Sequence, residues 1–149
     1  MKEFYMKEAL KEADKAFKLG EVPIGAVIVR NNEIIARGYN LRESAKDPTA
    51  HAEILAIKRA SEALGGWRLT NCDLYVTIEP CPMCAGAIVM ARIDRVFIGS
   101  MDPKGGAVGS LYNIVNDERL NHRAEVIYNV LSDECSNIMK EFFRNLRKK

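Results

Sequence analysis

The arrangement of apolar and polar residues along the chain predicts helices that alternate with strands. Residues 3–19 alternate charged and apolar groups with helical spacing, and cap and turn residues indicate three further helices. The four predicted helices are residues 3–19, 48–64, 82–92 and 132–147. The apolar, often β-branched runs between them have the length and composition of strands. The five predicted strands are residues 22–29, 33–36, 74–78, 95–99 and 125–130.

Glycine, asparagine and proline residues indicate where several of these elements begin and end. Gly20 and Gly65 follow the first two helices, where helices commonly end on a left-handed residue. Asn31-Asn32 separates two strand-like runs and predicts a hairpin turn. Asp47-Pro48 is typical of a helix cap followed by a first-turn proline, so we expect the second helix to begin at residue 48.

The order of these elements predicts an α/β fold. Helices interleaved with strands favour a three-layer α/β/α sandwich around one central sheet of about five strands. The early hairpin pairs two antiparallel strands, so the sheet should be mixed rather than wholly parallel. The sequence has no internal repeat, linker or low-complexity tract. We therefore expect a single domain over residues 1–149.

The composition agrees with one globular domain and only weakly indicates a partner. The chain has 149 residues, of which 48% are apolar and 28% charged, and its net charge is +2. That charge is too small to indicate a nucleic-acid partner by itself. Arg144, Arg147, Lys148 and Lys149 form a basic terminus. This terminus suits contact with phosphates, and it suits equally a solvated helix end, where cations complement the helix dipole.

The start of the chain and its apolar runs argue against export and membrane insertion. Residues 1–5 begin an amphipathic pattern instead of an apolar signal sequence. No apolar run approaches the roughly 20 residues that span a bilayer. We therefore expect a cytoplasmic protein without a membrane partner. In that compartment a Cys-x-x-Cys pair more often binds metal or serves redox chemistry than forms a structural disulfide.

The strongest chemical signal is His51-Ala52-Glu53 followed by Cys81-Pro82-Met83-Cys84. His51, Cys81 and Cys84 are three good zinc ligands, whereas a structural zinc is normally closed by four. A catalytic zinc keeps one position open for water, and Glu53 lies two positions from a ligand. The helix N-termini expected at these residues would also favour the thiolate form that binds metal. The pattern therefore predicts a zinc site that activates water.

Other interpretations of these residues remain open at the level of spacing. Glu53 could be a fourth ligand, a surface carboxylate or a proton carrier. The cysteine pair could be a redox dithiol, or half of a structural zinc site completed by another residue. Cys72, Cys135 and His122 are the remaining candidates for that ligand. We expect the two cysteines to be buried and His122 to be a surface or hydrogen-bonding residue.

The combined His-x-Glu and Pro-Cys-x-x-Cys pattern is the signature of the zinc deaminases. Beyond that signature the chain resembles the bacterial tRNA-specific adenosine deaminases, which convert the wobble adenosine of a tRNA anticodon to inosine. Segments 21–27, 47–53 and 74–87 carry a resemblance that is shared with deaminases of small molecules. The segments that resemble the tRNA enzymes more specifically are residues 102–111, 121–123, 133–135 and 142–144.

This resemblance implies a cytidine deaminase-like fold and a defined site. It implies one zinc ion per subunit, bound by His51, Cys81 and Cys84, with Glu53 as the catalytic proton carrier. The residues that it places beside the substrate are Asn40, Val22, Pro23, Ile24 and Asp102. It also implies a homodimer whose substrate is a tRNA anticodon stem-loop. The alternative is a deaminase of a free base or nucleoside such as guanine or cytosine.

Two positions depart from the pattern of the family. Gly106 stands where the resemblance allows either alanine or glycine, and Asn129 stands where glycine is frequent before the closing helix. Neither position belongs to the predicted zinc set, so the expected chemistry is unaffected.

Overall fold

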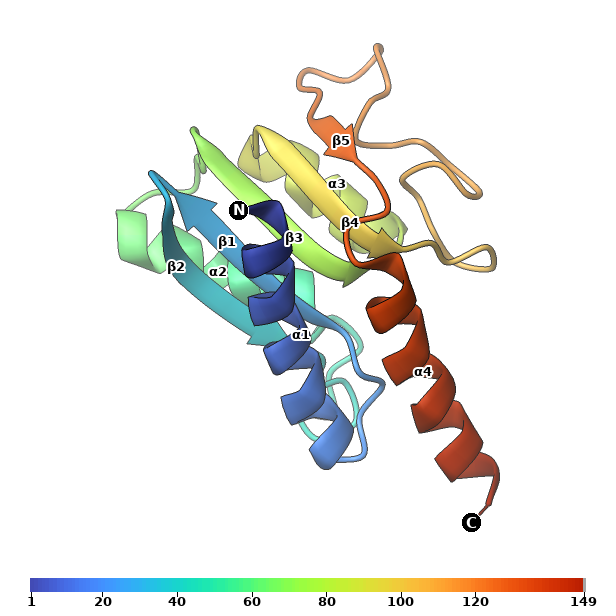
Figure 1. The fold of residues 1–149 in the computed structure, drawn as a ribbon. Helices are drawn as coiled ribbons and strands as arrows, with labels where there is room; N and C mark the ends of the chain where they lie inside the picture. Colours follow the sequence, from blue (N-terminus) through green and yellow to red (C-terminus); the bar gives the residue numbers. More distant parts are fainter. Residues whose placement is uncertain (149) are drawn as a thin grey trace.

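The computed structural model describes residues 1–148 and has a five-stranded mixed sheet at its centre (Figure 1). The strands are β1 (Gly25–Arg30), β2 (Glu33–Tyr39), β3 (Cys72–Ile78), β4 (Arg95–Ser100) and β5 (Glu125–Ile127). They lie in the order β2-β1-β3-β4-β5. Strand β1 runs antiparallel to both β2 and β3, whereas β3, β4 and β5 are parallel.

Four helices within the described residues cover the two faces of the sheet. They are α1 (Lys2–Lys18), α2 (Ala52–Leu64), α3 (Pro82–Ala91) and α4 (Ser132–Arg147). Helices α1 and α4 lie on one face, and α2 and α3 lie on the other (Figure 1). The predicted three-layer α/β/α sandwich with a mixed sheet is confirmed.

Strand β3 contributes to both hydrophobic cores. Leu74 and Val76 are fully buried on the face covered by α2 and α3. Tyr75 points to the opposite face, beneath α1, and stacks on Phe97 of β4 with ring centroids 4.2 Å apart. Successive side chains of a strand point to opposite faces, so a strand buried on both sides must be apolar throughout. This explains why residues 74–78 lack the polar alternation of a surface strand.

The predicted hairpin and the first helix are confirmed. Asn31 and Asn32 both have left-handed backbone angles, with φ of 51° and 62°, as a two-residue hairpin turn between twisted strands requires. Helix α1 ends just before Gly20, whose φ of 76° is also left-handed. Asparagine and glycine are the residues that adopt this conformation at least cost, which is why both boundaries were readable in the sequence.

The predicted start of the second helix is wrong. Helix α2 begins at Ala52, because the residues before it form a tight turn. The Asp47 carboxylate accepts hydrogen bonds from the backbone N–H and the hydroxyl of Thr49, at 2.8 and 2.7 Å. His51 N–H donates to the Thr49 carbonyl oxygen at 2.8 Å. Asp47 therefore closes a turn instead of capping a helix, and His51 takes the N-cap position.

The first and last strands are shorter than predicted. Ile24 N–H donates to the carbonyl oxygen of Val22 at 2.9 Å, and this tight turn around Pro23 keeps all three residues out of β1. Strand β5 ends at Ile127, and Asn129 then bends the chain with a φ of 62°. This left-handed angle accounts for the side chain found at position 129, since asparagine tolerates a conformation that otherwise favours glycine.

The close approach of α1 to the sheet depends on Gly25. A Cβ atom at this position would overlap the backbone of Ala9 and Ala13 in α1. Among the described residues, no helix is long and apolar enough to cross a membrane.

Candidate functional site

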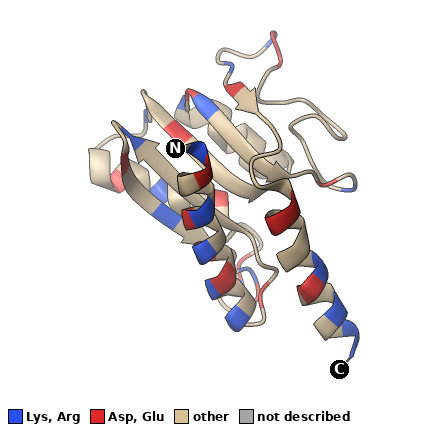
Figure 2. Ribbon diagram, viewed as in Figure 1, with Lys and Arg blue, Asp and Glu red and all other residues tan. Residues whose placement is uncertain are grey.

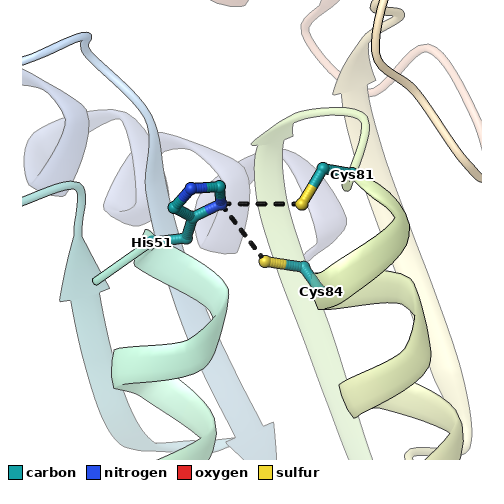
Figure 3. Close-up of side chains that lie close together, drawn as sticks. All are labelled: His51, Cys81 and Cys84. Atoms are coloured by element: carbon teal, nitrogen blue, oxygen red, sulfur yellow. Dashed lines mark hydrogen bonds between the residues drawn. The ribbon is translucent and has the colours of Figure 1, made fainter. Parts of the chain in front are cut away.

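The first element of the site is the start of helix α2. His51 has an extended backbone (φ −83°, ψ 153°) and is the N-cap residue, and Ala52 is the first residue of the helix. The turn closed by Asp47 directs the chain into this helix. The imidazole is partly buried and faces the start of α3 (Figure 3).

Helix α3 supplies the two sulfur atoms. Cys81 is its N-cap residue, Pro82 occupies the first position, and Cys84 lies in the first turn. Figure 3 shows both cysteine side chains pointing toward the imidazole of His51. The Sγ atoms of Cys81 and Cys84 each lie 3.6 Å from His51 Nδ1. All three ligand atoms lie within 4.8 Å of one another.

This spacing fits a zinc ion. Tetrahedral coordination with Zn–S of about 2.3 Å and Zn–N of about 2.0–2.1 Å places the sulfur and nitrogen ligands about 3.6 Å apart. One nitrogen and two sulfurs are also a donor set that zinc prefers. Among the residues that the structure describes, no further His, Cys, Asp or Glu joins this group. The three residues therefore form an open set and not a closed four-ligand site.

The pKa values of the two thiols differ in a way that suits metal binding. A hydrogen bond from the Cys84 thiol, together with His51, lowers the pKa of Cys81 to about 4 despite partial burial. The hydrogen bond to Cys81 and burial raise the pKa of Cys84. Hydrogen bonding to Cys81 raises the pKa of His51. Without metal, Cys81 is readily present as a thiolate, and Cys84 and His51 favour their protonated forms. A bound cation would displace the protons of Cys84 and His51.

Glu53 lies in the first turn of α2, two residues after His51 and only 4% exposed. Burial raises the pKa of its carboxyl group from 4.5 to about 7. Burial alone would make this carboxylate costly, and the helix N-terminus offsets part of the cost because it favours negative charge. A group with this pKa can both take and give a proton near neutral pH.

A pocket of about 150 Å³ opens beside His51. Its lining residues come from three segments that are distant in sequence, and they are Val22, Ile24, Asn40, Arg42, His51, Ala52 and Glu53. The structure thus brings the predicted substrate-side residues Val22, Ile24 and Asn40 to one pocket with His51 and Glu53. Pro23 is buried between its neighbours and lines neither this pocket nor the larger groove beside it.

Asn40 is buried and already fixed by the protein. Its Nδ2 donates to the Val22 carbonyl oxygen at 3.2 Å, and its Oδ1 accepts from Arg42 N–H at 3.1 Å. An amide group has two N–H donors and two lone pairs on its oxygen. One donor and one acceptor therefore stay available for a molecule in the pocket, in an orientation set by these two bonds.

A larger groove of about 780 Å³ continues from the pocket, and we call it the α4 groove. Val22 and Ile24 line both cavities, so the two are contiguous. The other main residues of the groove are Ile78, Asp102, Pro103, Lys104, Lys140, Phe143, Arg144 and Arg147. Figure 2 shows that Lys and Arg positions gather along the C-terminal half of the α4 ribbon. Asp102, predicted from resemblance, lies in this groove and not in the small pocket. Lys149 lies outside the described residues.

Two residues of the site were not predicted from the sequence. Arg42 lines the pocket, and Glu21 is 1% exposed and accepts hydrogen bonds from the backbone N–H groups of Glu43 and Ser44. Glu21 therefore holds the loop that carries Arg42. The only sequence signal was the proximity of Arg42 to Asn40 and of Glu21 to Val22, and such proximity does not indicate a role.

The remaining cysteines and the second histidine do not contribute to the metal group. Cys72 and Cys135 are fully buried, as expected, and burial raises the pKa of Cys135 to about 12. His122 Nε2 lies 2.7 Å from the carbonyl oxygen of Ile93, which confirms its expected hydrogen-bonding role. None of these residues is positioned as a fourth ligand.

Comparison with known proteins agrees with this geometry. The sequence matches the MafB19-like deaminase family over residues 1–147. It is 58% identical over 147 residues to the tRNA-specific adenosine deaminase of Bacillus subtilis (strain 168), covering 99% of this chain and 91% of the relative. The chain belongs to the family of tRNA-specific adenosine deaminases. The family predicted from the zinc motif and the segments around it is therefore confirmed.

Solved structures share the deaminase fold of this chain. A structure from a study of A-to-I editing by tRNA:A34 deaminases at the wobble position of transfer RNA superposes with a TM-score of 0.87. It is 47% identical and covers 91% of this chain and 98% of its own. The guanine deaminase of Bacillus subtilis superposes with a TM-score of 0.64 and is 44% identical. That second match covers only 66% of this chain and 64% of its own, so the family of tRNA deaminases accounts for more of the chain.

Proposed function

We propose that this deaminase hydrolyses the wobble adenosine of a tRNA anticodon loop to inosine and releases ammonia. The observation that carries the proposal is the convergence of His51, Cys81 and Cys84 beside the buried Glu53, at the end of a pocket that opens into a basic groove. The names of the relatives, tRNA-specific adenosine deaminase and tRNA:A34 deaminase, support this substrate over a free base.

We propose that His51, Cys81 and Cys84 hold one zinc ion per subunit. The ligand set and the 3.6 Å spacing of its atoms support zinc. Zinc held there would lower the pKa of a bound water molecule to about 7, so that hydroxide would be accessible at neutral pH.

We assign the proton transfers to Glu53. Its carboxylate takes a proton from the water that adds to C6 of the adenine ring, and gives it to N1. A second proton leaves the resulting hydroxyl group through Glu53 and reaches the departing amine, so that the products are inosine, still part of the RNA, and ammonia. The pKa of about 7 supports both directions of transfer, because neither protonation state of Glu53 is strongly disfavoured near neutral pH.

We assign the binding of the base to the 150 Å³ pocket. Asn40 would use its remaining donor and acceptor on the ring, and Val22 and Ile24 would contact the faces of the base. Pro23 supports the pocket from behind through the tight turn that it occupies, since it is buried. A base in an RNA loop can be splayed out into such a pocket because it is not held in a duplex.

The α4 groove is the proposed path for the anticodon stem-loop. The charged residues that line it are Asp102, Lys104, Lys140, Arg144 and Arg147. Such cations would bind phosphates and make the affinity depend on salt. Replacing Arg147 by glutamine should weaken RNA binding and reduce its salt dependence. Lys58, which lies on α2 away from this groove, is the matched control position.

We propose further that the chain forms one domain that works as a cytoplasmic homodimer. An exposed apolar patch over α2 and α3 supports an interface between copies. Trp67 and Met90 in this patch are 56% and 69% exposed, and they border a shallow pocket with Ile57 and Ala87. If this patch is the interface, Met90→Glu should halve the mass measured by native mass spectrometry, and an unchanged mass would exclude the patch.

The decisive experiment is the conversion of an anticodon stem-loop that carries a wobble adenosine. Zinc-loaded protein should form inosine in that RNA, measured after nuclease digestion by mass spectrometry. Guanine and cytosine should be offered to the same preparation. Turnover of a free base with no inosine in the RNA would overturn the proposal in favour of a small-molecule deaminase.

A further inference from the structure

Glu79 is a buried carboxylate that the proposed chemistry does not use. It is 3% exposed and directly precedes Pro80-Cys81. Its Oε1 accepts hydrogen bonds from the N–H of Asp102 at 2.9 Å and from the hydroxyl of Ser110 at 2.5 Å. Its Oε2 accepts from the N–H groups of Val108 and Ser110, at 2.9 and 3.0 Å. All four donors belong to one loop, residues 102–110.

The backbone around Glu79 holds the same loop. Glu79 N–H donates to the Ser100 carbonyl oxygen at 2.8 Å, and Ala107 N–H donates to the Pro80 carbonyl oxygen at 2.8 Å. Gly106 passes so close that a Cβ atom on it would overlap the Glu79 carboxylate. Alanine, which the family resemblance allowed at this position, therefore does not fit in this chain unless the loop moves. These hydrogen bonds join the loop to the segment that carries Cys81.

This loop forms one wall of the α4 groove. Asp102, Pro103 and Lys104 line the groove together with residues of α4, and Val22 and Ile24 connect it to the small pocket. The position of that wall relative to Cys81 is set by the hydrogen bonds of Glu79 at both ends of the loop. A shift at Asp102 would move the wall of the groove without moving the metal ligands, because Cys81 is also fixed as the N-cap residue of α3.

The choice of a carboxylate at this position calls for a reason other than packing. Burying a carboxylate is costly, whereas an apolar side chain would be buried without that cost. The partners of this carboxylate are neutral N–H and O–H groups, so no charged partner offsets the cost. A carboxylate is an acceptor at both oxygens, so it can hold several converging backbone N–H groups at once. That property suits the fixing of a loop in one conformation.

We infer that Glu79 is a positioning residue for the RNA substrate, which it serves by holding residues 102–110 as the wall of the groove beside the metal ligands. The inference rests on the proposed function and extends it. Glu79 would act on the binding of the stem-loop through Asp102 and its neighbours, and it would not touch the reacting base. Its loss should therefore change KM for RNA and leave kcat nearly unchanged.

Glu79→Gln tests this at the level of one hydrogen bond. The NH2 group of the glutamine can occupy only the position of Oε1. At that position the Ser110 hydroxyl can rotate and accept a hydrogen bond from the NH2 group. The Asp102 N–H would then lose its acceptor, while Val108 and Ser110 N–H keep theirs. The substitution thus releases the Asp102 end of the loop and retains the rest.

The experiment measures kcat and KM for an anticodon stem-loop, together with zinc content, for the wild-type protein and Glu79→Gln. We expect KM to rise about tenfold, with kcat within about twofold and zinc content unchanged, the pattern of a binding interaction lost equally in the ground state and transition state. Ser110→Ala removes only the hydroxyl from the carboxylate and should shift KM in the same direction by a smaller factor. It serves as the second variant if Glu79→Gln does not fold.

Arg37→Gln is the matched control for lost stability. Arg37 lies on β2, away from the groove, and bonds to the buried carboxylates of Glu8 and Glu12. The Arg37→Gln variant should have a lower unfolding midpoint and an unchanged KM. This result separates an effect of lost stability from an effect of loop positioning. An unchanged KM in Glu79→Gln and in Ser110→Ala would overturn the inference, and so would a fall in kcat or zinc content with KM unchanged. If the wild-type protein forms no inosine, the proposed function fails instead.

Discussion

The Asn40 side chain donates a hydrogen bond to the backbone carbonyl oxygen of Val22, at 3.2 Å. The residue predicted to hold the base is thus also the residue that fixes one wall of the pocket. The two residues are 18 positions apart, and they meet because β1 and β2 form a hairpin that brings the start of one strand beside the end of the other.

Asn40→Ala should lower kcat/KM for the stem-loop by about 10- to 100-fold, because it removes polar contacts to the base and releases Val22. Steady-state inosine formation measures the change. Asn40→Asp keeps an acceptor for Arg42 N–H but cannot donate to Val22, so it should recover little of the activity. Full activity in either variant would show that the pocket does not rely on this amide.

Glu53→Gln should abolish turnover without loss of metal. General acid–base groups contribute about 10²–10⁴-fold, and we propose more than one proton transfer for this carboxylate, so the loss should reach or exceed that range. Single-turnover assays measure the rate, and elemental analysis measures zinc. Glu62→Gln, an exposed change on the same helix, is the control and should be fully active. Parallel loss of zinc and activity would make Glu53 a ligand.

Removing the metal should abolish activity and expose one thiolate. The lowered pKa of Cys81, about 4, keeps it ionised at pH 6, whereas burial raises the pKa of Cys135 to about 12. Iodoacetamide at pH 6 should therefore label Cys81 in chelator-treated protein and spare Cys135. Mass spectrometry of peptides locates the label. Zinc added before the reagent should protect Cys81 and restore turnover, and equal labelling with and without zinc would argue against the assigned ligands.

Glu8→Gln should lower stability near neutral pH more than in acid. Hydrogen bonds from Lys11 and then Arg37, both at 2.7 Å, hold the pKa of Glu8 below its ordinary 4.5. Stabilisation by a carboxylate with a lowered pKa is complete above the unfolded value and is lost as the pH falls through the folded value. Urea unfolding midpoints of variant and wild type are measured at pH 7 and at pH 3.5. The difference between the two proteins should be smaller at pH 3.5. A difference that does not change with pH would contradict this, and Glu141→Gln, exposed on α4, is the control.

The sequence was sufficient wherever one segment carried the whole signal. The boundaries at Gly20 and Asn31-Asn32 were predictable because a left-handed backbone favours specific residues. The start of α2 was not, because Asp47 can close a turn or cap a helix with the same side chain, and the choice depends on which conformation the next residues take in the folded chain. The tight turn around Pro23 shortened β1 for a similar reason.

The sequence by itself determined the family and was enough to predict three zinc ligands and a carboxylate near them, because metal preference and motif spacing are properties of local sequence. Only the tertiary structure decided that Val22 and Asn40 share a pocket and that Asp102 lies in the adjoining groove. It also decided that Glu79 holds the loop that carries Asp102. These contacts join segments that precede or follow different strands of the sheet, whose order is β2-β1-β3-β4-β5. Each isolated segment has an ordinary pattern, and its role arises only when hydrogen-bonding groups from distant strands converge and burial removes the competing water.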